Sequence, residues 1–315
     1  MNVTEVAQRV LKGDRRAVAR AISMVEDGAE GLAELSSGLF GHTGRASTVG
    51  LTGSPGVGKS TLAGELVRLA RHRDLSVAVL AIDPTSPFTG GALLGDRLRM
   101  QEHATDPGVF IRSMATRGHL GGMALAAPEA VRILDASGKD LVMVETVGVG
   151  QAEVDVAAAT DTTLVVVSPG WGDAVQVAKA GILEIADVFV VNKSDQEGAG
   201  TAARDLEQMI RMGSPMAWTP PVVRVSAQRS EGLDELWEAM ARHRQHVEET
   251  GQLEQKRRDR LLREVEGLAG ERLRGRVREA LADDPALADE VAGRTTDPYR
   301  AADILIERTS RPGNP

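Results

Sequence analysis

The sequence contains the stretch Gly53-Ser54-Pro55-Gly56-Val57-Gly58-Lys59-Ser60-Thr61, which matches the phosphate-binding loop pattern G-x-x-x-x-G-K-[ST]. Glycines let the backbone of such a loop curl, so that successive N–H groups point at phosphate oxygens. Lys59 supplies a positive charge for the β- and γ-phosphates, and Ser60 supplies a hydroxyl ligand for Mg²⁺. The stretch predicts an α/β fold, a P-loop NTPase with a mostly parallel central sheet flanked by helices.

The residues on both sides of the loop fit this architecture. Ala46–Leu51 reads as a short strand and Thr61–His72 as a helix. The loop is therefore expected at a helix N-terminus, where exposed N–H groups and the helix dipole favour an anion.

The composition of the 315-residue chain narrows the class of protein. Its 42% hydrophobic and 26% charged residues are ordinary for a globular protein, and its net charge of −8 argues against a nucleic-acid surface. No stretch approaches the ~20 apolar residues of a membrane helix, and the N-terminus lacks the apolar run of a signal peptide. Cysteine is absent, which excludes disulfides and thiolate metal sites. We expect a cytoplasmic protein that binds neither nucleic acid nor membranes.

Apolar patterning divides the chain into three regions. Residues 1–45 have helical periodicity, with Thr4 as the candidate N-cap. Residues 46–228 form the P-loop domain, in which short apolar runs alternate with helical stretches, as in a parallel sheet covered by helices. Residues 229–315 are helical again. Predicted strands are Val77–Ile82, Val109–Ile111, Leu141–Val144, Thr163–Val167, Val188–Val191 and Val222–Val225, and the clearest helices between them are Met123–Ala136 and Asp173–Ala186.

The C-terminal region contains an Arg- and Glu-rich helix at Gln252–Ala282. Two interpretations of this helix stay open: a solvated helix with one packed face, or an arm that forms a homodimer. Both use the same imperfect apolar stripe of Leu261, Val265, Leu268, Leu273, Val277 and Leu281.

A second motif, Asn192-Lys193-Ser194-Asp195, indicates which nucleotide binds. An Asp carboxylate accepts hydrogen bonds from N1–H and the exocyclic amine of guanine, whereas adenine lacks that pair of donors. Asp195 therefore favours GTP and GDP over adenine nucleotides. Lys193 is expected to pack along the base, and Asn192 to join loops. Ser226-Ala227 matches a second guanine-contact loop, in which a backbone N–H meets the base oxygen.

The third motif, Glu145-Thr146-Val147-Gly148, stands where most P-loop GTPases carry D-x-x-G. In that motif the acid helps hold the Mg²⁺ shell, and the glycine N–H meets the γ-phosphate. Here the acid is Glu145, one methylene longer than Asp. The next residue is Val149, where Ras-like GTPases carry a water-orienting Gln, and Gln151 is out of register. Hydrolysis of the Ras type is therefore not available at this position.

Two further acids are candidates for the same site. Asp83 ends the second predicted strand, within Asp83-Pro84-Thr85-Ser86-Pro87, and is expected to face the nucleotide. A Pro-rich turn without a site role is the alternative. Asp96 follows in Leu94-Gly95-Asp96.

Taken together, these motifs resemble one family, MeaB/ArgK. Its members are bacterial relatives of the human methylmalonic aciduria type A protein, and they are GTPase chaperones of adenosylcobalamin-dependent acyl-CoA mutases. The resemblance covers nearly the whole chain, and RGHLGG and ETVGVGQ are its most specific parts. It rests on Gly53–Thr61, Asp83–Met100, Arg112–Met123, Glu145–Glu153 and Asn192–Asp195.

The resemblance implies how the site works. GTP is hydrolysed to GDP by in-line attack of water, assisted by Mg²⁺ and Lys59, with Asp83 positioning the water and Gly148 at the γ-phosphate. The P-loop backbone holds the phosphates. For His119, a structural hydrogen bond is favoured over a role as catalytic base. The implied Mg²⁺ ligands are Ser60, Asp83, Asp96 and Glu145.

The resemblance also implies mobile switches and partners. The switches lie around Asp83–Met100, Glu145–Glu153 and Pro169–Lys179. The third departs from its relatives at Trp171, at Ala174 and after Lys179, where Ala180 replaces a second lysine. The implied partners are an adenosylcobalamin-dependent acyl-CoA mutase, an adenosyltransferase and, through a C-terminal dimerisation arm, a second copy of the chain.

Three other functions compete with this interpretation. A nickel or cobalt metallochaperone GTPase shares the nucleotide core, but such relatives carry Cys-rich or His-rich motifs, and this chain has no Cys and six scattered His. A transport-associated ATPase or kinase is disfavoured by the guanine motif. A switch that binds GTP and barely hydrolyses it is favoured by Val149.

Overall fold

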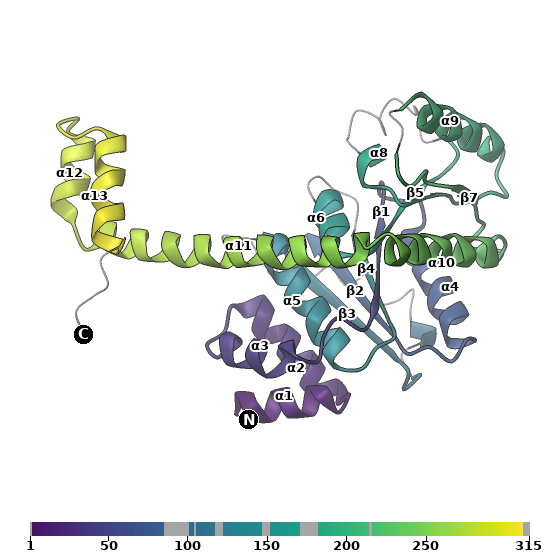
Figure 1. The fold of residues 1–315 in the computed structure, drawn as a ribbon, viewed down its shortest axis with the longest axis horizontal. Coiled ribbons are helices and arrows are strands. Elements are labelled where there is room, and N and C mark those ends of the chain that lie inside the picture. The colour runs from purple at the N-terminus through teal and green to yellow at the C-terminus, as the bar shows by residue number, and fades with distance from the viewer. Residues whose placement is uncertain are drawn as a thin grey trace. The chain divides into compact units, whose positions relative to one another are not determined.

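The computed structural model describes residues 2–84, 101–103, 105–116, 122–146, 152–170, 182–213 and 216–310. The chain forms two compact units, Met1–Arg260 and Leu261–Pro315. Figure 1 labels the helices and strands of both units.

A seven-stranded parallel sheet lies at the centre of the first unit (Figure 1). The strand order is β3-β2-β4-β1-β5-β6-β7, so β1 has β4 and β5 as neighbours. Leu51 near the end of β1 is in register with Glu145 on β4 and Leu164 on β5. The loop that follows β1 therefore starts between the carboxyl ends of two other strands. The strands are β1 Ser47–Thr52, β2 Val77–Pro84, β3 Val109–Thr116, β4 Leu141–Thr146, β5 Thr162–Val167, β6 Val188–Val191 and β7 Val222–Arg224.

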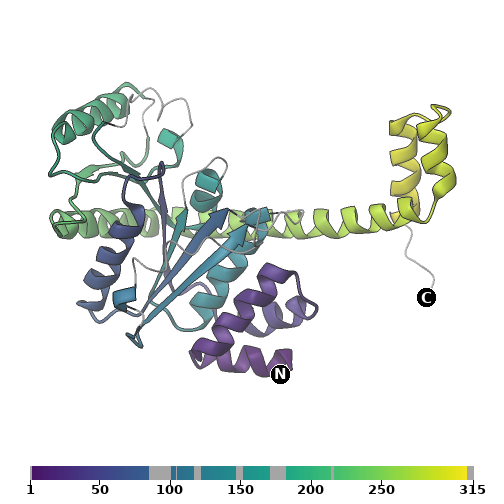
Figure 2. The ribbon, with the colours of Figure 1, turned by 180° about the vertical axis from the view of Figure 1, so that it is seen from behind.

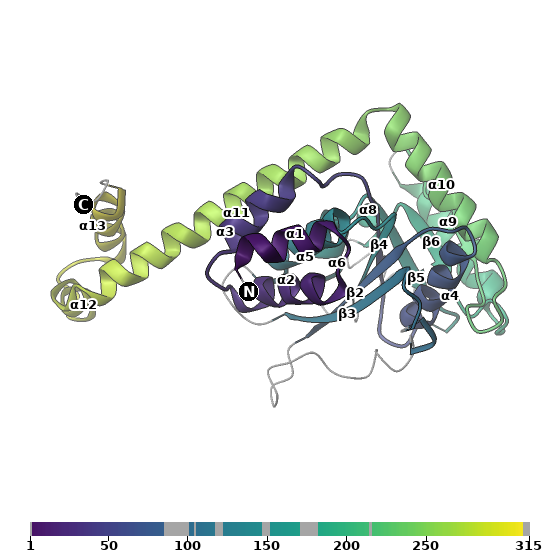
Figure 3. The same ribbon diagram turned by 90° about the horizontal axis from the view of Figure 1, so that it is seen from below.

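Helices cover both faces of the sheet, which explains why the strands are apolar throughout. Side chains alternate between faces along a strand. On β4, Val142 and Val144 pack with α5, α6 and the N-terminal helices, whereas Leu141 and Met143 pack with α4 and α10. Figures 2 and 3 show α4 and α10 on the opposite side of the sheet from α1–α3. The helices are α1 Val3–Leu11, α2 Arg15–Asp27, α3 Leu32–Phe40, α4 Lys59–Arg71, α5 Gly122–Ala136, α6 Ala152–Ala159, α8 Ile182–Ile185, α9 Ala199–Met212 and α10 Leu233–Glu249, with a 3₁₀ turn η1 at Gln101–His103.

The N-terminal helices are part of the first unit and dock on α5 and β3. Arg112 of β3 donates to the carbonyl oxygen of Ala19 at 3.1 Å and to the hydroxyl of Ser23 at 2.9 Å, and it pairs with Glu26. The prediction that Thr4 caps the first helix is wrong. Asn2 is the N-cap, because its side-chain oxygen accepts from the Thr4 N–H at 3.3 Å, and α1 starts at Val3, two residues earlier than a Thr4 cap would place it.

A buried acidic side chain anchors the start of α11 (Gln252–Ala282) to the sheet. Asp161, which precedes β5, is fully buried. It pairs with Arg257 at 2.6 Å and with Arg244 and Arg260 at 3.3 Å each. Burial by itself raises the pKa of Asp161, but the hydrogen bond and charge of Arg257, with the charges of Arg260 and Arg244, hold that pKa below its usual value.

The second unit contains the rest of α11 with α12 (Pro285–Ala292) and α13 (Pro298–Ser310). Leu287, Ala301 and Leu305 form its small core. Asp284 caps α12 by accepting from the Leu287 N–H at 3.0 Å. In the described part of the chain, no helix combines the length and apolarity needed to cross a bilayer.

The predicted α/β fold class is confirmed, and the differences are in the ends of elements. Each predicted apolar run overlaps a strand, but β1 starts one residue later, at Ser47, and β7 ends one residue earlier, at Arg224. β3 continues from Ile111 to Thr116, and β2 extends to Pro84. The extension of β3 contains Arg112, Ser113 and Thr116, so its polar residues break the apolar run, and its strand character comes from pairing with β2. Of the helix predicted at Asp173–Ala186, the described residues contain α8 alone.

Candidate nucleotide-binding site

The phosphate loop joins β1 to α4. At two of its positions another part of the chain lies so close that only glycine fits. Gly53 has φ +135°, and a Cβ there would lie 2.1 Å from the carbonyl oxygen of Val166 on β5. Gly58 has φ +95°, and a Cβ there would lie 2.4 Å from Nδ2 of Asn192. Both positions therefore need glycine for backbone conformation and for space. The first packs the loop on the sheet, and the second lets the loop meet the predicted base motif.

Lys59 and Ser60 open α4 and point back into the loop. Lys59 is 5% exposed, and its ammonium donates to the carbonyl oxygens of Gly53 at 2.6 Å and Ser54 at 2.9 Å. The Ser60 hydroxyl donates to Oε1 of Glu145 at 2.6 Å. The fold thus brings a buried cation, a hydroxyl and a carboxylate to the N-terminus of one helix, as the sequence predicts for a phosphate and Mg²⁺ site.

The predicted Mg²⁺ ligands are described only in part. The Ser60 hydroxyl and the Glu145 carboxylate are hard oxygen ligands side by side, and this donor set fits Mg²⁺. The backbone of Asp83 lies at the end of β2, two residues beyond Ala81, which is in register with Glu145. The Asp83 side chain, Asp96 and Gly148 lie outside what the structure describes. No group of three His, Asp or Glu side chains that could hold a metal occurs among the described residues.

Asn192 connects the predicted base motif to the phosphate loop. Its Nδ2 donates to the carbonyl oxygen of Val57 at 2.8 Å, and its Oδ1 accepts from the Ala227 N–H at 3.1 Å. Lys193 has φ +57° and donates from Nζ to the carbonyl oxygen of Gly56 at 2.8 Å. The three loops therefore form one hydrogen-bonded assembly. In this structure the Ala227 N–H donates to Oδ1 of Asn192. The predicted contact of a backbone N–H of this loop with the base oxygen therefore stays a prediction.

Asp195 is held by the second predicted base loop. The Ser226 hydroxyl donates to Oδ1 of Asp195 at 2.6 Å. This hydrogen bond is the main reason that the pKa of Asp195 is lowered, and the charge of Arg229 adds to it. The carboxylate is therefore ionised near neutral pH, the state in which it can accept two hydrogen bonds from a base.

Sequence reasoning missed two residues of the base loop and one of α4. Arg229 Nε lies 3.7 Å from Oδ2 of Asp195. The Ser230 hydroxyl donates to Oε2 of Glu65 on α4 at 2.7 Å. A signal was present for Arg229, a basic residue three positions after Ser226 in the same short loop. No sequence signal pairs Ser230 with a helix 165 residues away.

Several predicted residues fall outside the described part of the chain. These are Val149 and Gln151 after the third motif, His119 in RGHLGG, and the third switch beyond Gly170. Their predicted roles are untested by the structure.

Comparisons with known proteins agree with this geometry. The family model "Methylmalonyl Co-A mutase-associated GTPase MeaB" matches residues 18–282. The chain belongs to the MeaB family. A protein of Pyrococcus abyssi, provisionally named as a GTPase, is 47% identical over 311 residues, which cover 97% of this chain and 96% of that protein. The mitochondrial methylmalonic aciduria type A homolog of Caenorhabditis elegans is 36% identical over 280 residues, covering 82% and 70%.

A solved structure shares the fold of this MeaB-family chain. The crystal structure of a protein named "LAO/AO transport system kinase" superposes with a TM-score of 0.72 at 25% identity and covers 98% of each chain. The predicted family, the P-loop fold and the class of GTPase are thereby confirmed. The family match disfavours the nickel or cobalt metallochaperone interpretation.

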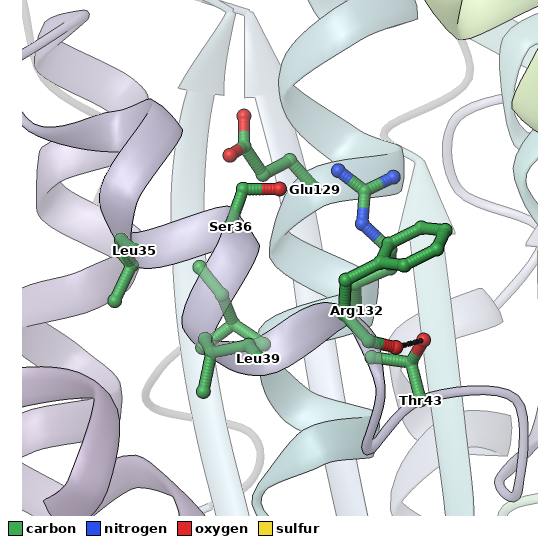
Figure 4. A pocket seen from close by; sticks show the side chains of 8 residues that line it. Leu35, Ser36, Leu39, Thr43, Glu129 and Arg132 are labelled. Carbon is green, nitrogen blue, oxygen red and sulfur yellow. Dashed lines mark hydrogen bonds between the residues drawn. The ribbon is translucent and has the colours of Figure 1, made fainter.

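A small pocket on the first unit is lined by none of these residues (Figure 4). It separates α3 from α5, and the Thr43 hydroxyl at its edge donates to the carbonyl oxygen of Phe40 at 2.8 Å. Its lining contains no predicted site residue. The lining side chains are Leu35, Ser36, Leu39, Phe40, Thr43, Glu129, Arg132 and Ile133.

Proposed function

We propose that this MeaB-family GTPase gates adenosylcobalamin loading, or the protection, of an acyl-CoA mutase of the methylmalonyl-CoA mutase type. The family model and the relationship to a methylmalonic aciduria type A homolog support the partner class. The observation that carries the GTP-dependent part is the hydrogen-bonded chain from Asp195 through Ser226, Ala227 and Asn192 to Val57. It fixes Asp195, the carboxylate that we assign to guanine, relative to the phosphate loop.

Each part of the site has a role in this proposal. The backbone of Gly53–Thr61 receives the phosphates, with Lys59 as the neutralising cation. Asp195 selects guanine, Lys193 packs beside the base, and Asn192 keeps the two subsites at a fixed separation. Ser60 and Glu145, with Asp83 and Asp96, would hold Mg²⁺, which neutralises charge that develops on the phosphates. Asp83 positions the attacking water, and Gly148 meets the γ-phosphate.

One observation favours a different function. The solved relative with a TM-score of 0.72 is named as a transport system kinase. An ATP-dependent kinase gains nothing from a carboxylate that pairs with N1–H and the amine of guanine, because adenine offers Asp195 no such pair of donors. The geometry of Asp195 therefore supports the GTPase chaperone over the transport kinase.

The test measures whether an acyl-CoA mutase changes the rate of hydrolysis. Single-turnover hydrolysis of GTP is followed with and without the cobalamin-free mutase encoded nearest this chain's gene. We expect the mutase to raise the rate by about 5- to 150-fold, the range of a coupling free energy of about 1–3 kcal/mol. The reason is that a partner that binds one switch conformation preferentially shifts its population.

Two controls make the result specific. An unrelated acyl-CoA enzyme without cobalamin should leave the rate unchanged. Asp173→Ala or Lys179→Ala, in the predicted third switch, should weaken the response to the mutase more than the affinity for GTP. An unchanged rate with every cobalamin-dependent acyl-CoA mutase tested, and no adenosylcobalamin transfer to any of them, would refute the proposed partner class.

A further inference from the structure

The base loop that follows β7 is a closed turn with one charged side chain at its tip. Ser226 and Glu231 exchange backbone hydrogen bonds at 3.1 Å in both directions. The Arg229 N–H donates to the Ser226 carbonyl oxygen, also at 3.1 Å. Ser230 adopts φ +57°, a conformation that non-glycine residues adopt only when the surroundings favour it. The loop conformation therefore fixes where the Arg229 side chain begins.

Contacts on two sides hold this turn in place. On one side the Ser226 hydroxyl binds Oδ1 of Asp195 at 2.6 Å. On the other side the Ser230 hydroxyl binds Glu65 of α4 at 2.7 Å, and Glu65 is itself paired with Arg68 at 2.7 Å. Because α4 is the helix that starts at the phosphate loop, the turn is tied to both ends of the nucleotide site.

The position of Arg229 is defined by these constraints. Its Nε lies 3.7 Å from Oδ2 of Asp195, the carboxylate oxygen that Ser226 does not bind. The Asp195 side chain is 16% exposed and that of Arg229 is 60% exposed. An ionised carboxylate offers about four acceptor positions. The two donors of a guanine edge, the Ser226 hydroxyl and the Arg229 guanidinium can therefore all face Asp195 together.

We infer that Arg229 is a positioning residue for the guanine site. Its guanidinium holds the Asp195 carboxylate ionised and in a fixed orientation, and so strengthens binding of guanine nucleotides. The inference rests on the proposed assignment of Asp195 to the base. Arg229 acts through Asp195 and is not a catalytic residue. Arg229 belongs neither to the four-residue motif Asn192–Asp195 nor to the pair Ser226-Ala227.

The test is titration of GDP and ADP against the full-length chain and its variants by calorimetry. Arg229→Ala should raise the Kd of GDP by about two- to fivefold, the range expected for a partly exposed ion pair. Arg229→Lys keeps the charge and should recover most of the affinity. In ~1 M salt the Debye length is about 3 Å, shorter than the 3.7 Å between Arg229 and Asp195, so the difference between wild type and Arg229→Ala should shrink.

The matched control is Arg242→Ala on α10. Arg242 is 56% exposed and has a carboxylate partner of its own, Glu238 at 3.9 Å, so the substitution removes the same charge from a similar ion pair elsewhere. It should leave the Kd of GDP unchanged. Thermal unfolding of each variant checks that the fold is intact.

Three results would overturn the inference. Equal GDP affinity of wild type and Arg229→Ala at low salt would show that the ion pair does not support the base site. Tighter binding by Arg229→Ala would show that the guanidinium occupies the place of the base. A loss that is as large in ~1 M salt as at low salt would show that Arg229 acts through its shape and not through its charge. The comparison of GDP with ADP in the wild type tests the guanine assignment of Asp195 separately. If the wild type does not prefer GDP, that assignment is wrong whatever the variants show.

Discussion

The hydroxyl of Ser60 donates to Oε1 of Glu145 at 2.6 Å, and this contact joins the first turn of α4 to the carboxyl end of β4. The two residues are 85 positions apart in the chain. Their oxygens meet because Leu51, near the end of β1, is in register with Glu145. A longer acid at this position therefore still reaches the serine that follows the phosphate-loop lysine.

The first prediction concerns the metal. Hydrolysis of GTP should vanish in EDTA and return with Mg²⁺, and Glu145→Ala should abolish the Mg²⁺-dependent rate because one of two adjacent oxygen ligands is lost. The measurement is single-turnover hydrolysis across a Mg²⁺ titration. Glu102→Ala, which removes a carboxylate of η1, is the control and should keep the wild-type dependence. Undiminished turnover in Glu145→Ala would exclude this acid from the metal shell.

The second prediction concerns the choice of nucleotide. GDP should bind more tightly than ADP by roughly 2–4 kcal/mol, because adenine leaves the Asp195 carboxylate without its pair of donors. Asp195→Asn should reduce this preference, since an amide presents a donor to N1–H. Calorimetric titration of both nucleotides is the measurement. Equal affinities in the wild type would contradict the guanine assignment.

The third prediction concerns Gly58. Gly58→Ala places a Cβ 2.4 Å from Nδ2 of Asn192 at φ +95°, so Asn192 must give up its position against the phosphate loop. A residue with a Cβ in this region costs about 1–2 kcal/mol, and we expect GDP affinity to fall by about tenfold or more. Gly64→Ala is the matched control, because a Cβ there meets nothing within 4 Å in the middle of α4. It should stabilise the protein by up to about 1 kcal/mol and leave the Kd unchanged.

The fourth prediction concerns the stability of the first unit. Asp161→Asn leaves Arg244, Arg257 and Arg260 without their shared buried counter-charge. We expect the free energy of unfolding to fall by about 3 kcal/mol, measured by urea denaturation. Asp234→Asn, which breaks an exposed pair with Arg73, should cost less than about 1 kcal/mol.

Acid should remove the same stabilisation. The pKa of Asp161 is lowered in the folded chain, so its contribution is fully present above the unfolded pKa of about 3.9 and is lost as pH falls through the folded pKa. The difference in stability between wild type and Asp161→Asn should therefore be constant near neutral pH and shrink below about pH 4. A difference that does not change on acidification would mean that the carboxylate charge is not what stabilises the fold.

The fifth prediction concerns assembly. The second unit exposes large apolar side chains along α11, among them Val265 at 62% and Leu268 at 41%. Exposed apolar rows of this kind mark interaction surfaces, and we expect a homodimer at micromolar concentration. Val265→Lys with Leu268→Lys should give a monomer by light scattering. Met212→Lys, at an exposed methionine of α9, should remain dimeric. A monomeric wild type would rule out a stable arm.

The nucleotide motifs were predictable from the sequence because short-range chemistry defines them. A phosphate loop needs glycines and a lysine at fixed spacing, and these residues identify the strand before it and the helix after it. The continuous apolar run Val188-Phe189-Val190-Val191 predicted the bounds of β6, because a strand buried on both faces contains mainly large apolar residues. The bounds predicted for the long C-terminal helix, Gln252–Ala282, also match those of α11.

Tertiary structure alone decided which distant residues meet. Sheet order brings β1 between β4 and β5, which places Glu145 beside Ser60 and the Val166 carbonyl oxygen against Gly53. The sequence by itself determined the P-loop fold, the guanine motif and the MeaB family, because each depends on residue types at fixed spacing. The pairings Asn192–Val57, Ser230–Glu65 and Arg229–Asp195 depend on how loops from different strands pack at one edge of the sheet. Such packing is a property of the whole chain, and no local pattern encodes it.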